Sequence, residues 1–575
     1  MNPEPSAAGW TALTFLGYIL LVYGIAVFAH HVSKGKSFLK EYFLGSRSLG
    51  PWTLALTFAA TSASGGSFAG FPSLIYTYGW VLALWIAGYM VFPICTMGFL
   101  GKRINQVAKK CDAVTLPDIF RDRYNSPWLG LLTAFLIIFY LVVYLIAQFK
   151  AGGVLIQTLM KDLAFFQGIS GRLEGVASLF EGVSSGYLAG LLLFTTSVVL
   201  YTAYGGFRAV VLTDVMQGII MGLGVIILLP LTLHTAYVYL DPPDLEPAAL
   251  VEVESRREAR NEEPFRMTQF SQGLRKVGEH LKQEDPSAMS APGHKKTDDM
   301  DGEDFKPFLP LGLAISFFFL WPISGSGQAG NMLRLMAFQN TKTLARAIFA
   351  VTIYYGFIYI PLVIIFVCAK TLPLSVEQSD QAMPAMAMLV APPLLAGLLI
   401  AAPFAAIMST VDSFLLMISS ALVRDIYQRA INPDVSERAI RIASLATTLA
   451  VGFLVLLLTI NPPQFLQDII VFGSAGQAAT FLGAMVLTLY WPRANAAGTA
   501  SAMITGFVVV AGLYTIGRLQ TGEFVPWAPY DIHPFIWGLI GSFIGGVLGS
   551  LATPPPSERT VARFFYASDH VEPSS

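Results

Sequence analysis

The sequence predicts an all-α integral membrane protein that crosses the bilayer with about 13 helices. Three observations predict this fold class. Hydrophobic residues make up 54% of the 575 and charged residues only 13%, about half the charged share of soluble domains. Apolar runs long enough to cross a hydrocarbon core of about 30 Å recur along the chain. Lysine and arginine gather beside alternate runs, as the positive-inside rule requires.

Thirteen apolar segments are predicted to span the bilayer. They are Trp10–His30, Trp52–Tyr76, Trp80–Leu100, Leu129–Met160, Gly186–Tyr204, Val210–His234, Phe308–Met336, Ala345–Ala369, Leu394–Leu422, Ala443–Ile460, Ile469–Tyr490, Gly498–Ile516 and Phe535–Leu551. The first lacks the basic n-region of a signal peptide, so we expect it to be retained as a helix. Most basic residues fall in loops on one side, among them Arg123 and Arg334. That side should be cytoplasmic, with the N-terminus outside and the C-terminus inside.

One long polar insertion, residues 241–306, interrupts the apolar segments. It is rich in acidic residues and low in aromatics, with runs such as VEVESRREARNEE and KKTDDMDGEDF. Such a composition buries too little apolar surface to offset the entropy of ordering. We expect a solvated, partly disordered outer loop with one short helix.

Two predicted spans contain residues that interrupt a helix. The second span carries LTFAATSASGGSFAGFP, and the seventh carries LWPISGSGQAG, in which Pro322 lacks a donor and three glycines loosen the backbone. Irregular chain inside a bilayer survives only where protein buries it or it lines a wet cavity. Small residues can also simply allow close helix packing. Two interrupted spans, five spans apart, favour a transporter built from inverted repeats with its site between the breaks.

Charge within a membrane span is costly and usually functional, and the clear cases in the predicted spans are Lys150, Asp214 and Asp412. Lys150 lies toward the outer end of its span, and we favour the interpretation that it snorkels to the interface. Asp214 lies about one turn from the cytoplasmic end of the sixth span and could line an exit path for a cation. Asp412 lies in AAIMSTVDSFLLMISS, where Ala406, Ser409, Thr410 and Ser413 share one helical face.

The oxygens of this helical face suit a hard monovalent cation such as sodium. A single serine in a membrane helix often bonds back to its own i−4 carbonyl, but a cluster of hydroxyls beside an aspartate favours a binding site. The helix is therefore predicted to bind a cation.

Enzyme motifs are absent from the sequence. The seven histidines form no HExxH pattern, no GxxxxGK[ST] loop occurs, and Cys95, Cys111 and Cys368 have no paired spacing. We therefore expect no catalytic residue, no organic cofactor and no nucleic-acid partner. The expected partners are a small-molecule substrate and the lipid bilayer, and the expected state is a monomer in the cell (inner) membrane.

Several motifs resemble those of the sodium/solute symporter family. They are EYFLGSRSLGPW, AVTLPDIFRDRY, YTAYGGFRAVVLTDVMQG, AAPFAAIMST and SSALVRDIY, and the likeness covers roughly Leu16 to Leu551 except the insertion. Within the family, EYFLGSRS, YTAYGGFRA, LIAAPFAAIMST and YWPRANAAGTASAMITG are most similar to the sodium/pantothenate branch. The resemblance implies a sodium-coupled symporter that imports a small organic carboxylate such as pantothenate by alternating access.

The resemblance also implies a LeuT-like five-plus-five inverted repeat. The expected division is an extra N-terminal helix and loop (1–51), the first repeat (52–234), the insertion (235–307), the second repeat (308–490) and two C-terminal helices with a short cytoplasmic tail (491–575). Alternatives are a sodium symporter of a monocarboxylate, amino acid, sugar or sialic acid, a transporter-like sensor, and a passive channel. The short tail argues against a sensor, and the lack of repeated charge rings argues against a channel.

Binding residues follow from the resemblance by matching motif to motif. The sodium ligands would be the carbonyls of Ala60, Ala63 and Ala406 and the hydroxyls of Ser409 and Thr410. A second sodium site or exit path would use Asp214, Asp412 and Ser413, although Asp412 replaces the family's usual serine or threonine and leaves the stoichiometry open.

Substrate ligands are expected between the two breaks. The candidates are Ser62, Ser64 and Gly65 in the second span, Tyr144 and Gln148 in the fourth, and Trp321, Gly325 and Gln328 in the seventh. Ser62 holds the place of an aspartate in the proline branch, so proline-type coordination is not expected. Helix N-termini exposed at a break favour an anionic group such as a carboxylate.

Overall fold

The structure, a computed structural model, describes residues 5–32, 49–240, 267–294, 307–462 and 466–565. Within these ranges every regular element is a helix, apart from two isolated β-bridges. The longer elements are α1 (Pro5–Val32), α3 (Pro51–Ser62), α4 (Phe71–Tyr78), α5 (Ala83–Pro93), α6 (Lys102–Lys110), α7 (Leu116–Tyr124), α8 (Pro127–Met160), α9 (Ala164–Ala177), α10 (Ser185–Tyr239), α12 (Met267–Glu284), α13 (Leu311–Gly327), α14 (Ala329–Met336), α15 (Thr341–Ala369), α16 (Ala382–Val390), α17 (Pro393–Ser420), α18 (Glu437–Leu458), α19 (Leu466–Tyr490), α20 (Ala496–Thr521), α21 (Pro534–Leu551) and α22 (Glu558–Phe565). The π-helical segments are η2 (Gly66–Gly70), η4 (Ile94–Gly101) and η7 (Ala421–Ile431), and the short 3-10 helices are η3 (Gly79–Leu82), η5 (Pro286–Ala288), η6 (Ser379–Gln381) and η8 (Pro529–Asp531).

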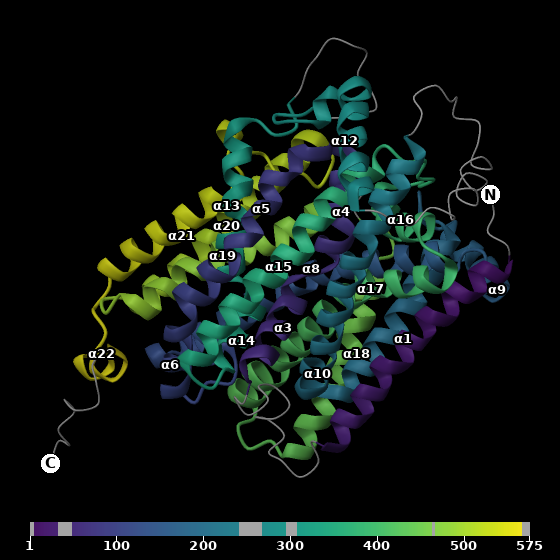
Figure 1. Cartoon of the computed structure of the whole chain (residues 1–575). Helices are drawn as coiled ribbons and strands as arrows, with labels where there is room; N and C mark the ends of the chain where they lie inside the picture. Colours follow the sequence, from purple (N-terminus) through teal and green to yellow (C-terminus); the bar gives the residue numbers. More distant parts are fainter. Residues whose placement is uncertain (1–4, 33–48, 241–266, 295–306, 463–465, 566–575) are drawn as a thin grey trace.

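The long helices pack side by side in one bundle, with α12 at one end and α6, α14 and α22 at the opposite end (Figure 1). In the described ranges, 11 helical runs are long and apolar enough to cross a membrane. The run Gly66–Lys110 joins parts of the second and third predicted spans, which separate at Gly79, where φ is +68°. The seventh predicted span appears as the shorter apolar helix α13. The prediction of an all-helical membrane fold is confirmed.

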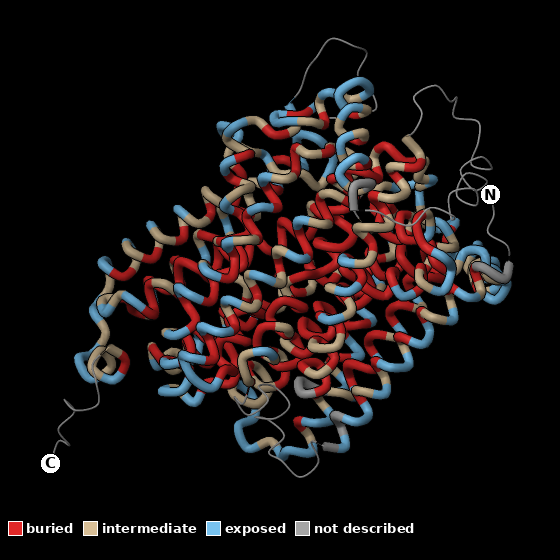
Figure 2. Tube along the Cα trace, in the orientation of Figure 1, coloured by how far each residue is buried: buried red, intermediate tan, exposed pale blue. Residues whose placement is uncertain are grey.

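The bundle is buried along its centre and apolar on its outside. Figure 2 shows buried residues through the middle of the bundle and exposed residues along its outer helices. Many exposed side chains are large and apolar, including Leu20, Phe135 and Phe349, which are 64%, 64% and 70% exposed. A soluble protein rarely exposes such a surface, whereas a bilayer covers it.

Both predicted helix breaks occur. The chain leaves the helix after Ser62 at Ala63, where φ is −82° and ψ is 84°, and becomes helical again at η2. The second break is shorter, because Gln328 alone is extended between α13 and α14, with φ −73° and ψ 127°. Pro322 lies inside α13 and does not end it. The assignment of the two repeats to fixed residue ranges stays a prediction.

Part of the predicted solvated insertion is folded onto the bundle. Helix α12 buries Val277 and Leu281, and the Asp285 carboxylate pairs with the Lys370 ammonium at 3.0 Å. Helix α12 is the short helix expected in this insertion, and one face of it packs on the bundle while most of its residues stay exposed or half-buried. The two acidic runs lie outside the described residues.

Arg123 was expected in a loop on the cytoplasmic side, and the structure places it in α7 with its side chain buried. Its guanidinium lies 5.0 Å from the ring centres of both Tyr124 and Phe564, so α22 covers it. A guanidinium is weakly hydrated and stacks on aromatic faces, which makes this burial tolerable. The sequence pattern does not show this burial, because the covering helix α22 lies more than 400 residues further along the chain.

Candidate functional site

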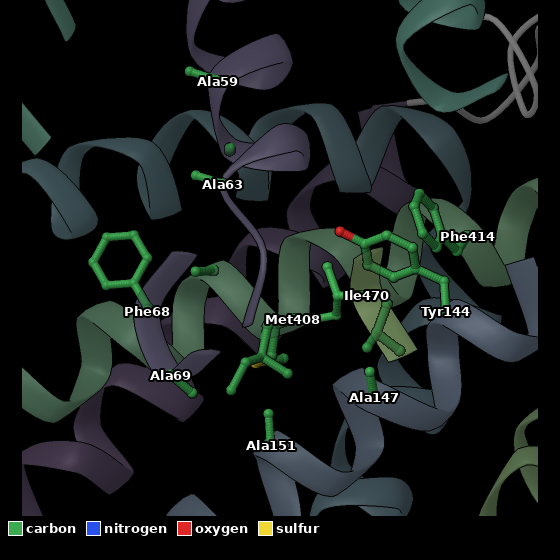
Figure 3. Packing of buried hydrophobic residues seen from close by; sticks show 14 of the residues in the cluster. Ala59, Ala63, Phe68, Ala69, Tyr144, Ala147, Ala151, Met408, Phe414 and Ile470 are labelled. Carbon is green, nitrogen blue, oxygen red and sulfur yellow. The ribbon is translucent and has the colours of Figure 1, made fainter. Parts of the chain in front are cut away.

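The first helix break brings backbone against the middle of α8. The amide of Gly65 donates to Oε1 of Gln148 at 2.8 Å, and a Cβ on Gly65 would itself lie 2.8 Å from that oxygen. Glycine is therefore needed here for close approach. Figure 3 shows the unwound chain after Ala63 lying among side chains of other helices, including Tyr144, Ala147 and Ala151 from α8 and Phe414 from α17.

Five oxygen atoms from α3 and α17 gather at this break. The Ser409 hydroxyl donates to the carbonyls of Ala60 at 2.8 Å and Ala406 at 3.0 Å. The Thr410 hydroxyl donates to the carbonyls of Ala406 at 3.1 Å and Thr61 at 3.3 Å. We call these five atoms the hydroxyl–carbonyl cluster. All five are neutral oxygens, which is the ligand type that a hard monovalent cation uses.

Four of the five predicted sodium ligands lie in this cluster, and one residue in it was not foreseen. Ala63 is buried as the first residue after α3, and its amide bonds back to Ala59 at 2.8 Å. Thr61, two residues earlier, supplies the carbonyl that Thr410 contacts. The sequence shows that the helix breaks near here but does not show which carbonyl faces α17, since that depends on the local backbone angles.

A second cluster joins the break to α8. The hydroxyls of Ser64 and Tyr144 share a hydrogen bond of 3.0 Å, and the Tyr144 ring packs edge-on against Phe414 with ring centres 5.0 Å apart. Figure 3 shows the Tyr144 hydroxyl directed toward the break. Gln148 is fully buried, and no described residue accepts a hydrogen bond from its Nε2. Four predicted substrate residues, Ser64, Gly65, Tyr144 and Gln148, therefore lie together around one unused donor.

Ser62 faces a different helix. Its hydroxyl donates to the Phe58 carbonyl at 2.7 Å and shares a short hydrogen bond with the Tyr355 hydroxyl of α15. Tyr355 was not foreseen from the sequence, because a tyrosine in an apolar span is usually only a packing residue.

The other predicted substrate residues lie in α13 (Trp321 and Gly325) and at the second break (Gln328). Trp321 packs among aromatic rings, with its ring centre 5.0 Å from that of Tyr89 and 5.7 Å from that of Phe71. No described residue accepts a hydrogen bond from the Trp321 indole nitrogen. The Asn331 side chain bridges the break, because its Nδ2 donates to the Gly325 carbonyl at 2.9 Å and to Oε1 of Gln328 at 3.2 Å.

A charged cluster lies one helical turn from the hydroxyl–carbonyl cluster. Nη2 of Arg334 is 2.9 Å from Oδ2 of Asp214 and donates to the Ser413 hydroxyl at 2.8 Å. The Thr57 hydroxyl donates to the same Asp214 oxygen at 2.5 Å. We call these four side chains the arginine cluster. The placement of Arg334 in a cytoplasmic loop is wrong, because its side chain is 1% exposed and lies against α3, α10 and α17.

Asp412 does not join the other two members of its predicted site. Its Oδ1 accepts from its neighbour's backbone, the Ser413 amide, at 2.8 Å, and no described residue donates to its Oδ2. Ser413 and Asp214 do lie together, with the Arg334 guanidinium contacting both.

Lys150 does not snorkel. Its ammonium is 3.0 Å from Oδ2 of Asp380 in η6, and the two side chains are 5% and 8% exposed. The interpretation failed because η6 lies between predicted spans, where the sequence shows no sign of a buried partner. Next to it, the Ser379 hydroxyl accepts from the Ser73 hydroxyl of α4 at 2.6 Å.

A cavity extends from the arginine cluster toward η7. Its polar lining includes Arg334, Ser413, Thr115 and Asp425. The Thr115 hydroxyl donates to Oδ1 of Asp425 at 2.8 Å. The cavity therefore joins the arginine cluster to the π-helical segment η7.

Comparison with known proteins shows which family this chain resembles in sequence and which solved structure it resembles in fold. The profile of the Sodium:solute symporter family matches residues 42–161, 161–239 and 265–506. The chain is 31% identical to a sodium/pantothenate symporter of Haemophilus influenzae, over 93% of this chain and 96% of that protein. It is 31% identical to a sodium/pantothenate symporter of Escherichia coli, over 94% and 95%. A solved structure of a Na+-coupled sialic acid symporter, substrate-bound and outward-open, matches the fold with a TM-score of 0.66 at 17% identity, covering 96% of this chain and 99% of that one.

Proposed function

Because this chain belongs to the Sodium:solute symporter family, we propose that it imports a small organic carboxylate together with sodium, and that pantothenate is the first substrate to test. The observation that carries this proposal is the hydroxyl–carbonyl cluster, in which Ser409 and Thr410 of α17 reach the carbonyls of the broken helix α3. The chain is a multi-pass protein of the cell inner membrane.

Sodium would bind at the hydroxyl–carbonyl cluster. The two hydroxyls, which here donate to carbonyls, would rotate their hydrogens away and present oxygen lone pairs to the ion. One ion would then hold the Ala60 and Thr61 carbonyls of α3 to α17, replacing the hydrogen bonds between the two helices. The ion would thereby fix the geometry of the break, where the substrate binds.

The substrate would bind beside the same break. Gln148 already holds the Gly65 amide through its Oε1, which leaves its Nε2 as a donor for a carboxylate or amide oxygen. Ser64 and Tyr144 supply hydroxyls next to it. Because sodium and substrate would both act on residues 60–65, each should raise the affinity for the other by the same factor.

Uptake into proteoliposomes tests the proposal. Labelled pantothenate should accumulate when sodium is high outside, and Ser409→Ala should raise the sodium concentration for half-maximal uptake about tenfold, the effect of losing about 1.4 kcal/mol of ion binding. Ser419→Ala is a matched control, because its hydroxyl on the same helix donates to the Ser444 carbonyl at 3.1 Å, away from the cluster.

The uptake experiment tests the sodium coupling and the substrate assignment separately. Uptake that ignores both the sodium gradient and Ser409→Ala would contradict the coupling mechanism. Sodium-driven uptake of a different monocarboxylate, amino acid or sugar, with no pantothenate uptake, would contradict only the substrate assignment.

A further inference from the structure

The cavity that joins the arginine cluster to η7 has a buried carboxylate at its η7 end. Asp425 lines the cavity and is 7% exposed, and its Oδ1 accepts from the Thr115 hydroxyl at 2.8 Å. The Oδ2 atom of Asp425 is buried, and no described residue donates to it. The Ser420 hydroxyl also lines the cavity and is buried, again with no partner among the described residues. Two side chains that line one cavity therefore each keep an unused oxygen.

The π-helical winding of η7 explains why both side chains reach the same cavity. Residues five apart on an α-helix point about 140° away from each other. A π-helix bonds residue i to residue i+5, so residues five apart lie nearly above one another, and such turns are frequent at functional sites. Ser420 directly precedes η7, and Asp425 is five residues further along. The winding therefore directs a hydroxyl and a carboxylate to one side of the helix.

The two arginines of η7 contact a different carboxylate. Nη2 of Arg429 is 2.9 Å from Oδ1 of Asp118, and Nε of Arg424 is 3.5 Å from Oδ2 of the same residue. The Thr115 hydroxyl accepts from the Asp118 amide at 3.3 Å and donates to Asp425, so it fixes where the Asp425 carboxylate lies. The two arginines balance the charges of both aspartates, and a further cation at Asp425 would be held only weakly.

The size and chemistry of the cavity suit a small cation. The centre of a water-sized sphere has about 30 Å³ there, and roughly 10–15 Å³ is enough for one water molecule. Carboxylate and hydroxyl oxygens are the ligands of a hard cation. At the opposite end of the cavity, Arg334 is already paired with Asp214. The unpaired carboxylate oxygen of Asp425 is therefore the attractive place for a cation in this cavity.

We propose that Asp425 and Ser420 form a release site, which sodium occupies after it leaves the hydroxyl–carbonyl cluster and before it reaches the cytoplasm. The inference rests on the proposed function, because the ion is the one that the carrier couples to its substrate. Thr115 is a positioning residue, since it holds Oδ1 and leaves Oδ2 to the ion. A cation inside buried protein is costly, and a carboxylate along its path lowers that cost. Weak binding then lets the ion leave again.

Two modes of transport separate sodium release from the other steps. Net uptake of labelled pantothenate into vesicles without internal sodium requires that sodium dissociates inside. Exchange of labelled for unlabelled pantothenate, with high sodium on both sides, does not require it. Asp425→Asn should slow net uptake about tenfold and leave the exchange rate within about twofold of the wild type. Ser420→Ala removes one ligand without breaking a hydrogen bond to any described residue, and should slow net uptake about threefold.

Asp434→Asn is the matched control for the loss of a carboxylate near the cytoplasmic end. Asp434 is exposed in the loop after η7, so its substitution should change neither mode of transport. If the wild type accumulates another carboxylate instead of pantothenate, that compound takes its place in both modes.

Each outcome decides the question. An equal loss of net uptake and exchange in Asp425→Asn would show that Asp425 has only a structural role. Unchanged net uptake in a folded Asp425→Asn variant would show that the cavity holds water only. Either result would overturn the inference and leave the proposed function intact. If Asp425→Asn does not fold, Ser420→Ala decides by the same comparison. No sodium-driven uptake of any carboxylate by the wild type would contradict the proposed function, and with it this inference.

Discussion

Two buried ion pairs flank the helix break, and they differ in burial and in surroundings. Arg334 and Asp214 lie beside α3, the half before the break, and are 1% and 0% exposed. Lys150 and Asp380 are 5% and 8% exposed, and η6 holds α4, the half after the break, through Ser379. The two halves of the broken helix therefore contact different buried ion pairs, α3 the Arg334–Asp214 pair and α4 the segment η6 that carries Asp380. Because the cost of an unpaired charge rises with burial, the first pair should be the more sensitive.

Breaking the Arg334–Asp214 pair should have the largest effect on stability. Asp214→Asn leaves a buried guanidinium without its counter-charge, and we expect a loss of about 4 kcal/mol. Adding Arg334→Gln removes the remaining charge and should restore much of that loss. Thermal or denaturant unfolding of the purified protein measures both. Equal stability of the single and double variants would show that the charge itself is unimportant here.

Breaking the Lys150–Asp380 pair should have an intermediate effect. Lys150→Met removes the ammonium and leaves the Asp380 carboxylate, which is 8% exposed and therefore within reach of some water. We expect a loss of about 2 kcal/mol, at the low end for a paired buried charge. The charge reversal Lys150→Asp with Asp380→Lys is the matched control and should recover part of it. A loss as large as that of Asp214→Asn would contradict the ranking by burial.

Breaking an exposed ion pair should have the smallest effect on the free energy of unfolding, and it gives the reference value for the two buried pairs. Arg275 and Glu279, one turn apart on α12, are 3.6 Å apart and 71% and 60% exposed. Water and salt screen such a pair, so Arg275→Ala should change the free energy of unfolding by no more than about 0.5 kcal/mol. The same unfolding assay measures it. A loss above that of Lys150→Met would mean that α12 contributes through something other than this pair.

Much of the fold could be predicted because the relevant information is local. The length and polarity of each apolar run predict a span, and the residues around Ser64 and Gln328 predict a break, since glycine and hydroxyl residues weaken a helix wherever they occur. Ser409 and Thr410 stand out as hydroxyls one turn from an aspartate on an apolar helix. The structure places both against the broken helix.

What the sequence by itself determined is where the chain crosses the membrane, where it breaks and which helix carries the hydroxyls. Only the tertiary structure decided which charges meet. Arg334 and Asp214 are 120 residues apart, and Lys150 and Asp380 are 230 apart, with no periodicity linking either pair. Whether a basic residue near a helix end reaches water or a buried carboxylate depends on which helix packs over it. That choice is made by packing between distant segments, and local patterns do not contain it.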